Sequence, residues 1–148
     1  MAWRWVEFDE MSAGELYEAL RLRQDVFIIE QECIYPELDG VDQASLHLLV
    51  RGDDRALVGT LRVVPPGARY EEPSIGRIVV RADARGAGLA RRMMAEAVAK
   101  CRALYPGRTI KIQAQQYLEG FYGSMGFRTI TEPYDEAGIM HVDMVLEG

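Results

Sequence analysis

A short segment combines two glycines with a run of arginines, and its chemistry suits an anion. It reads Val80-Arg81-Ala82-Asp83-Ala84-Arg85-Gly86-Ala87-Gly88-Leu89-Ala90-Arg91-Arg92. Gly86 and Gly88 allow the backbone to turn tightly and to approach a ligand closely. A helix that begins just after them offers unpaired amides and a partial positive charge at its N-terminus. These features together predict a phosphate-binding site.

The charge of this segment is opposite to that of the whole chain. Five arginines and one aspartate lie between Arg77 and Arg92, a net +4, whereas the 148-residue chain has a formal net charge of −6. Cations gathered at one helix start in an acidic protein favour a bound anion. The alternative is a plain turn at Gly86 and Gly88 with the arginines on a solvated face, and these residues alone leave both interpretations open.

The two common phosphate-binding motifs do not fit this segment. A P-loop requires Gly-x-x-x-x-Gly-Lys-Ser/Thr, and no lysine follows these glycines. A dinucleotide-binding fold requires Gly-x-Gly-x-x-Gly and an acidic residue after the next strand. Arg91 stands in place of the third glycine, and the next strand ends in Gln113-Ala114-Gln115. The anion is therefore not expected to be bound in either of these ways.

The composition is that of an ordinary globular chain, with 49% hydrophobic and 27% charged residues. A chain of this length can bury one core without disulfides or metals, so we expect a single domain over residues 1–148. No apolar run is long enough to span a membrane, and the acidic segment Met1–Asp9 does not suit a signal peptide. We therefore expect a cytoplasmic protein without a membrane partner.

The cysteines and histidines do not suggest a metal site. Cys33 and Cys101 match no metal-binding spacing, and the chain has only two histidines. The acidic net charge argues against binding to nucleic acid. We expect no metal and no nucleic-acid partner.

The hydrophobic pattern predicts alternating strands and helices. Ser12 and Glu15 form a capping box, so a helix is expected to begin there and to run to about Phe27. The strongest helical pattern covers residues 89–104, and Pro106-Gly107 ends it. Strands are expected at 3–8, 46–51, 56–64, 74–80, 109–114, 127–134 and 139–146, with a short helix at 118–124.

The order of these elements predicts the fold class. Two hairpins, 46–51 with 56–64 and 127–134 with 139–146, flank one β-α-β crossover. We therefore expect a mixed, mostly antiparallel α/β sheet with one parallel pair in the middle. Ligands bind beyond the C-terminal ends of such parallel strands, which is where the glycine segment lies.

Two motifs resemble those of the GNAT N-acetyltransferases. Arg85–Ala90 resembles the Arg/Gln-x-x-Gly-x-Gly/Ala loop of that family, and Tyr122–Phe127 resembles its Tyr-x-x-x-Gly-Phe segment. The order of the elements is also similar over nearly the whole chain. Further likeness to the ElaA-like branch lies in Arg23–Phe27, Glu30-Gln31, Tyr35-Pro36, Asp39–Asp42, His47 and Tyr134–Ile139. Met140 departs from the proline expected in that branch.

The resemblance implies an acetyl-CoA donor held between the two parallel strands, which are splayed apart. The pyrophosphate is then expected on the amides of Arg85, Gly86, Ala87, Gly88, Leu89 and Ala90, and on Arg91. The pantetheine arm is expected to pair with Ile78, Val79 and Val80 as an added strand would. Gln115 is expected to make a polar contact with the cofactor.

The implied reaction is direct attack of an amine on the thioester, which poses two proton problems. The acceptor amine must lose a proton, and the leaving thiolate needs one. Tyr122 matches the position of the general acid in the family, whereas its residue type alone also suits packing beside Phe121 and Phe127. Glu30 is the candidate general base, and a chain of water molecules ending at several carboxylates is the alternative.

The segment from Asp25 to Asp42 holds six carboxylates and no lysine or arginine. Because the family places this region beside the acceptor, we interpret it as an acidic wall that attracts a cationic amine; a solvated acidic loop is the alternative. His141 is a further candidate for the acceptor site. His47 is expected to be a hydrogen-bonded structural histidine, and Cys101 a core residue.

The predicted function is therefore acetyl transfer from acetyl-CoA to a primary amine of a small molecule or peptide. The alternatives are a non-catalytic acyl-CoA-binding module and an acyltransferase similar to the acyl-homoserine-lactone synthases. The presence of Tyr122 favours an enzyme over a binding module. Trp3, Trp5 and the final strand could pair with a second subunit, so a homodimer is possible on the sequence alone.

Overall fold

The centre of the computed structural model is one eight-stranded sheet, and the structure describes all residues from 1 to 148. Its strand order is β1-β2-β3-β4-β5-β8-β6, with β7 paired to β8. The strands are β1 (Ala2–Glu7), β2 (Leu46–Arg51), β3 (Leu57–Val64), β4 (Ser74–Val80), β5 (Ile110–Gln115), β6 (Arg128–Thr129), β7 (Tyr134–Glu136) and β8 (Ile139–Leu146). Only β4 and β5 run parallel, which confirms the predicted mixed, mostly antiparallel sheet.

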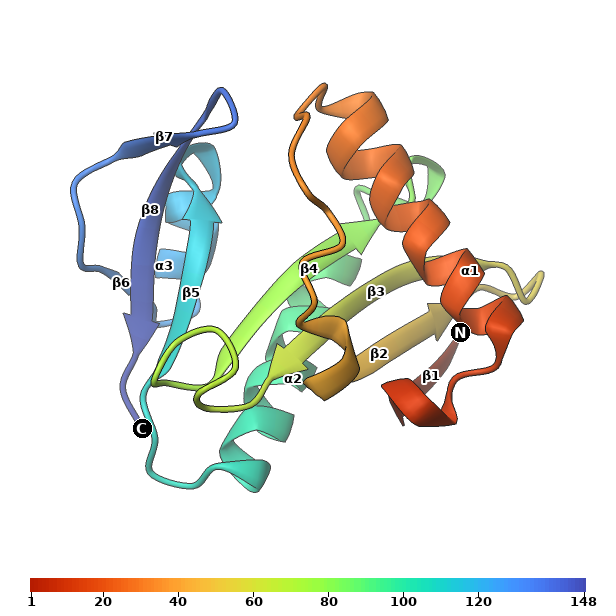
Figure 1. Ribbon diagram of the computed structural model, residues 1–148, viewed down its shortest axis with the longest axis horizontal. Coiled ribbons are helices and arrows are strands. Elements are labelled where there is room, and N and C mark those ends of the chain that lie inside the picture. The colour runs from red at the N-terminus through yellow and green to blue at the C-terminus, as the bar shows by residue number, and fades with distance from the viewer.

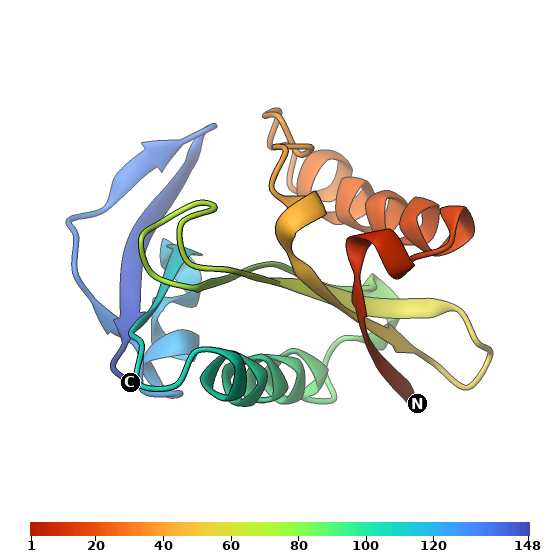
Figure 2. The same cartoon turned by 60° about the horizontal axis from the view of Figure 1, so that its bottom comes forward.

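Helices cover both faces of this sheet. Figure 2 shows α1 (Ala13–Arg23) on one face and α2 (Leu89–Leu104) on the other. The short helix α3 (Glu119–Gly123) follows β5, and single turns of 3-10 helix lie at Phe8–Glu10, Asp42–Ala44, Ala82–Ala84 and Gln116–Leu118. No helix combines the length and apolar character needed to cross a membrane.

The first helix begins as predicted, but its α-helical part ends at Arg23, before the predicted end near Phe27. The Ser12 hydroxyl accepts a hydrogen bond from the Glu15 amide at 3.1 Å, and the Glu15 carboxylate accepts one from the Ser12 amide at 2.9 Å. After Arg23 the chain continues as a π-helix over Gln24–Glu30. Such wide turns are common at functional sites, and this one carries Glu30 at its end.

The single strand predicted over 127–134 is wrong in detail. The structure has two short strands there, β6 and β7, with no strand between them. Pro133 has no amide hydrogen to donate to a ladder, so a continuous strand cannot pass through it. The hairpin that follows turns at Ala137 and Gly138, which both have positive φ (54° and 86°). Asp135 stabilises this turn by accepting a hydrogen bond from the Gly138 amide at 2.8 Å.

The parallel strands β4 and β5 separate almost at once. Their only register pair is Ser74 with Lys111, and Figure 1 shows the two strands diverging from the end where this pair lies. On its other edge β4 stays bonded to β3, but with a bulge: the register shifts between Thr60 and Arg62, and Arg77 adopts a positive φ of 50°. The sheet therefore opens into two halves beside β4.

Two hydrophobic clusters hold the helices to the sheet. The larger joins the sheet to α2 and α3, and includes Met93, Met94 and Cys101, which are fully buried as predicted. The smaller joins α1 to the opposite face. Trp3 and Trp5 pack against the larger cluster, with Arg92 and Lys100 of α2 over their rings at 5.9 and 5.5 Å. These tryptophans thus pack within the chain.

A largely buried network of three arginines and three carboxylates fixes the loop after the π-helix. Arg23 of α1 contacts Glu37 at 2.6 Å and Asp42 at 2.8 Å. Arg62 of β3 contacts Asp39 at 2.6 Å and Asp42 at 3.0 Å. Arg77 of β4 contacts Glu37 at 2.9 Å and Asp39 at 3.4 Å. The network is neutral overall and ties the loop to two strands and a helix.

Hydrogen bonds and ion pairs keep Asp39 and Asp42 ionised within this network. Burial alone would raise the pKa of Asp42, but its hydrogen bonds and ion pairs with Arg23 and Arg62 lower that pKa below the ordinary value. The pKa of Asp39 is lowered for the same reason, by Arg62 and Arg77. His47 lies beneath, where burial lowers its pKa and its Nε2 lies 2.9 Å from the Asp42 carbonyl oxygen. This confirms the structural role predicted for His47.

Replacement of one arginine of the network should lower the stability of the protein. Because Arg62 is 1% exposed, Arg62→Met leaves buried carboxylates without their full complement of charge. We expect the free energy of unfolding, measured by urea titration, to fall by about 3–5 kcal/mol. Arg128→Met is the matched control, since Arg128 pairs with Glu147 at the surface and such pairs contribute little. Equal effects of the two substitutions would contradict the structural role of the network.

Candidate functional site

A single large cavity of about 780 Å³ occupies the opening beside β4. It is lined on one side by Ile78, Val79 and Val80 of β4 and on the other by Gln113 and Gln115 of β5. The floor comes from α2 and α3, and the roof from the π-helix and the loop after it. Separation of the two strands leaves facing backbone groups unpaired along β4, so an extended ligand can supply their partners.

The start of α2 has the features of an anion site. Its N-cap, Gly88, has a φ of +77°, and Gly86 before it has a φ of +89°. No side chain caps this helix and no acidic residue lies in its first turn, so the first amides remain free for a ligand. A Cβ built on Gly86 or Gly88 meets no atom within 4 Å. The glycines therefore serve the backbone conformation and leave open space in front of the amides.

The arginines near this helix interact with different partners. Arg77 belongs to the buried network, and Arg92 lies over Trp3, so neither supports the predicted cation cluster at the helix start. Arg81 pairs with Asp83 at 2.5 Å. Arg85 and Arg91 remain beside the glycine segment, where Arg91 stacks on Phe121 at 5.2 Å and donates a hydrogen bond to Ser124.

The structure places the sequence-predicted site residues in two groups. Those that line the cavity are Glu30, Ile78, Val79, Val80, Arg85, Ala90, Gln115 and Tyr122. Gly86, Ala87, Gly88 and Arg91 lie in the exposed segment beside it, and the Leu89 side chain is buried in the core. Leu89 can therefore contact a ligand there only through its backbone.

Tyr122 combines packing with an accessible hydroxyl. Its ring is held edge-on by Phe121 and Phe127, with centroids 5.1 and 6.2 Å away. It lines the cavity, and its hydroxyl makes no hydrogen bond to the rest of the chain. Burial raises the pKa of Tyr122 to about 12, so the phenol is neutral and able to donate at pH 7. Both interpretations open from the sequence, packing and donation, are compatible with this geometry.

Glu30 and Arg85 contact each other across the mouth of the cavity. Their side chains, both partly exposed, form an ion pair at 2.8 Å. Arg85 also donates a hydrogen bond from Nε to the Val80 carbonyl oxygen at 3.0 Å. The candidate base is thus joined to the candidate phosphate-binding segment, a contact over 55 residues of sequence that motif spacing cannot reveal.

The acidic wall predicted from Asp25 to Asp42 is largely neutralised. Glu37, Asp39 and Asp42 form ion pairs within the arginine network, and Glu30 pairs with Arg85. The prediction was wrong on this point because the compensating arginines come from other elements of the chain. A general field from this segment therefore does not account for attraction of a cationic acceptor.

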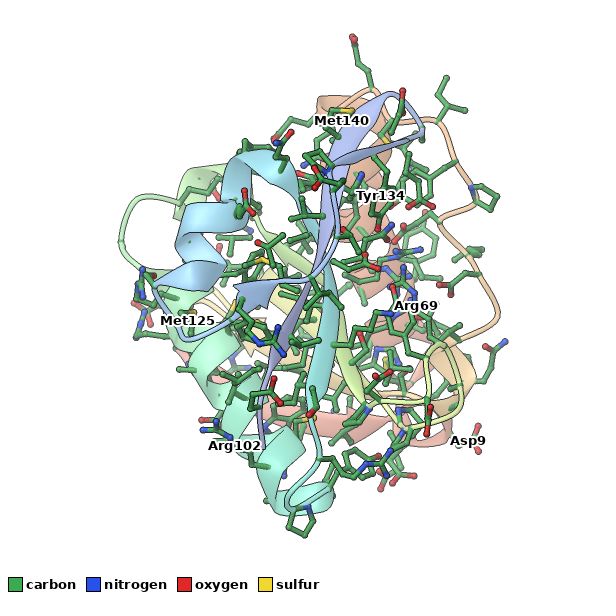
Figure 3. The ribbon with its side chains drawn as sticks, turned by 90° about the vertical axis from the view of Figure 1, so that its left-hand side faces the viewer. Asp9, Arg69, Arg102, Met125, Tyr134 and Met140 are labelled. Carbon is green, nitrogen blue, oxygen red and sulfur yellow. The ribbon has the colours of Figure 1, made fainter.

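A polar face on β5, β7 and β8 lies on the side of the sheet opposite α2 and α3. Alternate residues of β5 point to this face, and Gln113 at its centre accepts a hydrogen bond from Arg69 at 2.7 Å. Gln113 donates to the Tyr134 hydroxyl at 3.0 Å and to the Glu136 carboxylate. Figure 3 shows Arg69 and Tyr134 on this side of the strands, with Met125 and Arg102 on the other.

This polar face was not predicted from the sequence, although part of its signal was present. The alternation of Lys111, Gln113 and Gln115 with apolar residues marks one polar face of a strand. No comparable signal identifies Arg69 in the loop between β3 and β4, because only the fold brings it to Gln113.

His141 joins the same face from β8. It lines the cavity, stacks on Tyr134 with centroids 6.2 Å apart, and its Nδ1 lies 2.8 Å from the Ile139 carbonyl oxygen. That contact suits an Nδ1–H donor and leaves Nε2 as the acceptor atom. The structure therefore brings this candidate to the cavity.

Two contacts close the roof of the cavity between the halves of the sheet. Gln115 donates to the Gln31 side chain at 2.9 Å, and the Cys33 thiol donates to the Ala137 carbonyl oxygen at 3.6 Å. Burial raises the pKa of Cys33, with Glu136 adding to the effect. A protonated, buried thiol is a poor nucleophile, so Cys33 is part of the roof.

The combination of splayed parallel strands, an uncapped glycine-led helix and a facing tyrosine defines an acyl-CoA-dependent acyltransferase. Residues 15–148 match the acetyltransferase (GNAT) domain. A UPF0039 protein of Synechocystis is 40% identical over 97% of this chain and 93% of its own length. The chain belongs to the GNAT acetyltransferase family, in which the fold binds acyl-CoA.

Two solved structures support the same assignment. An acyl-CoA N-acyltransferase from Pseudomonas aeruginosa superposes with a TM-score of 0.92 at 34% identity, covering 98% of both chains. Escherichia coli ElaA superposes with a TM-score of 0.91 at 33% identity, covering 99% of both chains. The resemblance to the ElaA-like branch and the acyltransferase activity class are thereby confirmed.

The glycine segment offers a matched pair of substitutions. Gly88 precedes α2 and Gly107 follows it, both have positive φ (77° and 74°), and neither has an atom within 4 Å of a built Cβ. Gly88→Glu and Gly107→Glu should therefore cost similar stability. We expect only Gly88→Glu to weaken CoA binding, by tenfold or more in titration calorimetry, because it places a carboxylate before the free amides. Unchanged affinity in the folded Gly88→Glu protein would contradict the anion site.

Proposed function

We propose that residues 1–148 form one GNAT domain that transfers an acetyl group from acetyl-CoA to a primary amine. The observation that carries the proposal is the single cavity, which is lined by the edge of β4, by Tyr122 and by the polar face that holds Gln113. Donor, reacting carbonyl and acceptor can therefore meet in one enclosed space. A non-catalytic binding module would not need this second, polar side.

The donor follows the opened edge of β4. The amides of Arg85–Ala90, together with Arg91, bind the pyrophosphate, since they are uncapped and preceded by glycines of positive φ. Ile78–Val80 pair with the amides of the pantetheine arm, because beyond Ser74 this edge of β4 has no partner strand. Gln115 supplies a polar contact from the facing strand.

The reaction is a direct transfer without an acyl-enzyme. The amine nitrogen attacks the thioester carbonyl carbon, the C–N bond forms and the C–S bond breaks. The leaving thiolate takes a proton from the Tyr122 hydroxyl, which is neutral at pH 7 and has no competing partner in the chain. The proton lost by the amine returns to the tyrosine through the surrounding solvent and carboxylates.

Glu30 is the proposed acceptor of the amine proton. In the unliganded site its carboxylate is held in an ion pair with Arg85. A bound pyrophosphate competes for Arg85 and frees the carboxylate. Transfer through water to several carboxylates is the alternative route, and it does not depend on Glu30 alone.

Removal of the Tyr122 hydroxyl tests the general acid. Tyr122→Phe should keep its fold and its affinity for CoA, since the hydroxyl makes no hydrogen bond to the chain. We expect kcat for CoA release with an amine panel to fall by about 10²–10⁴-fold. Tyr17→Phe, on the exposed side of α1, is the control. Full activity of Tyr122→Phe would contradict the role as general acid and leave only the packing role. A preference of the unmodified enzyme for CoA donors with long acyl chains would favour the alternative similar to the acyl-homoserine-lactone synthases.

Replacement of Glu30 separates the two routes for the amine proton. Glu30→Gln removes the base and releases Arg85, so kcat should fall at least tenfold while affinity for CoA is kept or improved. The measurement is steady-state kinetics beside calorimetry with CoA. An unchanged kcat would exclude Glu30 as the base and favour the water-mediated route.

A further inference from the structure

The charges that line the cavity are unequally paired. Of its three carboxylates and three arginines, Glu30 pairs with Arg85 and Asp39 pairs with Arg77. Arg69 and Glu136 are left, and none of the salt bridges of the chain includes either of them. Before the donor binds, one cation and one anion of the cavity lining are therefore without a charged partner and available to a ligand.

These two free charges are held at a fixed separation by one side chain. Gln113 accepts a hydrogen bond from Arg69 through its carbonyl oxygen and donates one to Glu136 through its amide nitrogen. The charges fix the orientation of the amide, with oxygen toward the cation and nitrogen toward the carboxylate. Arg69 and Glu136 thus stand at opposite ends of a single carboxamide, a separation that suits a compact ligand.

Each member of this trio is kept in place by its surroundings. The Arg69 guanidinium stacks on the Tyr70 ring at 5.0 Å and uses only one of its nitrogens for Gln113, so other donors remain free. Gln113 also donates to Tyr134, which in turn donates to Asp143. Burial and Asp143 raise the pKa of Tyr134, so it adds no charge at neutral pH.

We infer that the acceptor of this acyltransferase is a compact zwitterion, an α-amino acid or a similar small molecule that carries an ammonium group and a carboxylate. This inference rests on the proposed function. The carboxylate lies on Arg69, where a guanidinium gives a charge-assisted hydrogen bond. Glu136 attracts the ammonium group, and the amine reaches the thioester after it has lost its proton. A peptide amine lacks a carboxylate close enough to use both charges.

Matched acceptors provide the direct test. CoA release is measured with the standard L-amino acids and with their amides, which keep the amine and lose the carboxylate charge. For the accepted amino acids we expect kcat/KM to exceed that of the amide by about ten- to hundred-fold, the range for a hydrogen bond to a charged group. Equal rates for acid and amide, or activity only with amines that lack a carboxylate, would overturn the inference and leave the proposed function intact.

Variants show whether Arg69 causes the preference. Arg69→Gln should abolish the difference between acid and amide, lowering the rate of the acid while leaving the amide nearly unchanged, and Arg69→Lys should restore part of it. A purely structural role would lower both rates alike and would contradict the assignment. Arg102→Gln, on the far side of the sheet in Figure 3, is the control for loss of a surface arginine.

Binding separates failure of the inference from failure of the proposed function. Calorimetry of amino acids and their amides against the CoA-bound protein should detect the acid and not the amide. Absence of CoA release with every amine would overturn the proposed function. Selective binding of the acid would still support the zwitterion site in that case, and absence of both would overturn the two together.

Discussion

The structure depends on the separation of β4 from β5. The two parallel strands share one register pair, Ser74 with Lys111, and then diverge, so backbone groups inside the protein face a cavity in place of a neighbouring strand. Buried peptide groups need hydrogen-bond partners, and an extended ligand with its own amides can supply them. The uncapped start of α2 lies at the same opening. The unpaired edge of β4 and the uncapped helix start therefore lie together at one opening.

The arginine–carboxylate network fixes the loop that lies over this opening. A sheet that splits needs something to hold the loops over the gap, and ion pairs connect the loop after the π-helix to β3, β4 and α1. Buried ion pairs are poor sources of net stability, but they fix geometry because a displaced charge is costly. Because the carboxylates of this loop are paired with arginines, Arg69 and Glu136 are the unpaired charges of the cavity that can bind a ligand.

The net charge around the acidic segment, residues 25–42, could not be predicted from the sequence. Residues 25–42 contain no basic residue, and a charge count along the chain therefore describes them as an anionic wall. Arg62 and Arg77 lie 20 residues or more further along and meet these carboxylates only because β3 and β4 pass beneath the loop. The polar face around Gln113 was missed for the same reason, since Arg69 reaches it across 44 residues.

Local features were determined by the sequence itself. The capping box at Ser12, the turn conformations of Gly86 and Gly88 and the apolar stripe of α2 depend on neighbours within a few residues. These local patterns also fix the order of the helices and strands along the chain, from which the fold class could be predicted. Only the tertiary structure decided which charges are paired. Charged residues separated by tens of positions meet because the strands of the sheet bring them together. Coulomb attraction depends on distance in space and on burial, and neither can be determined from positions in the sequence.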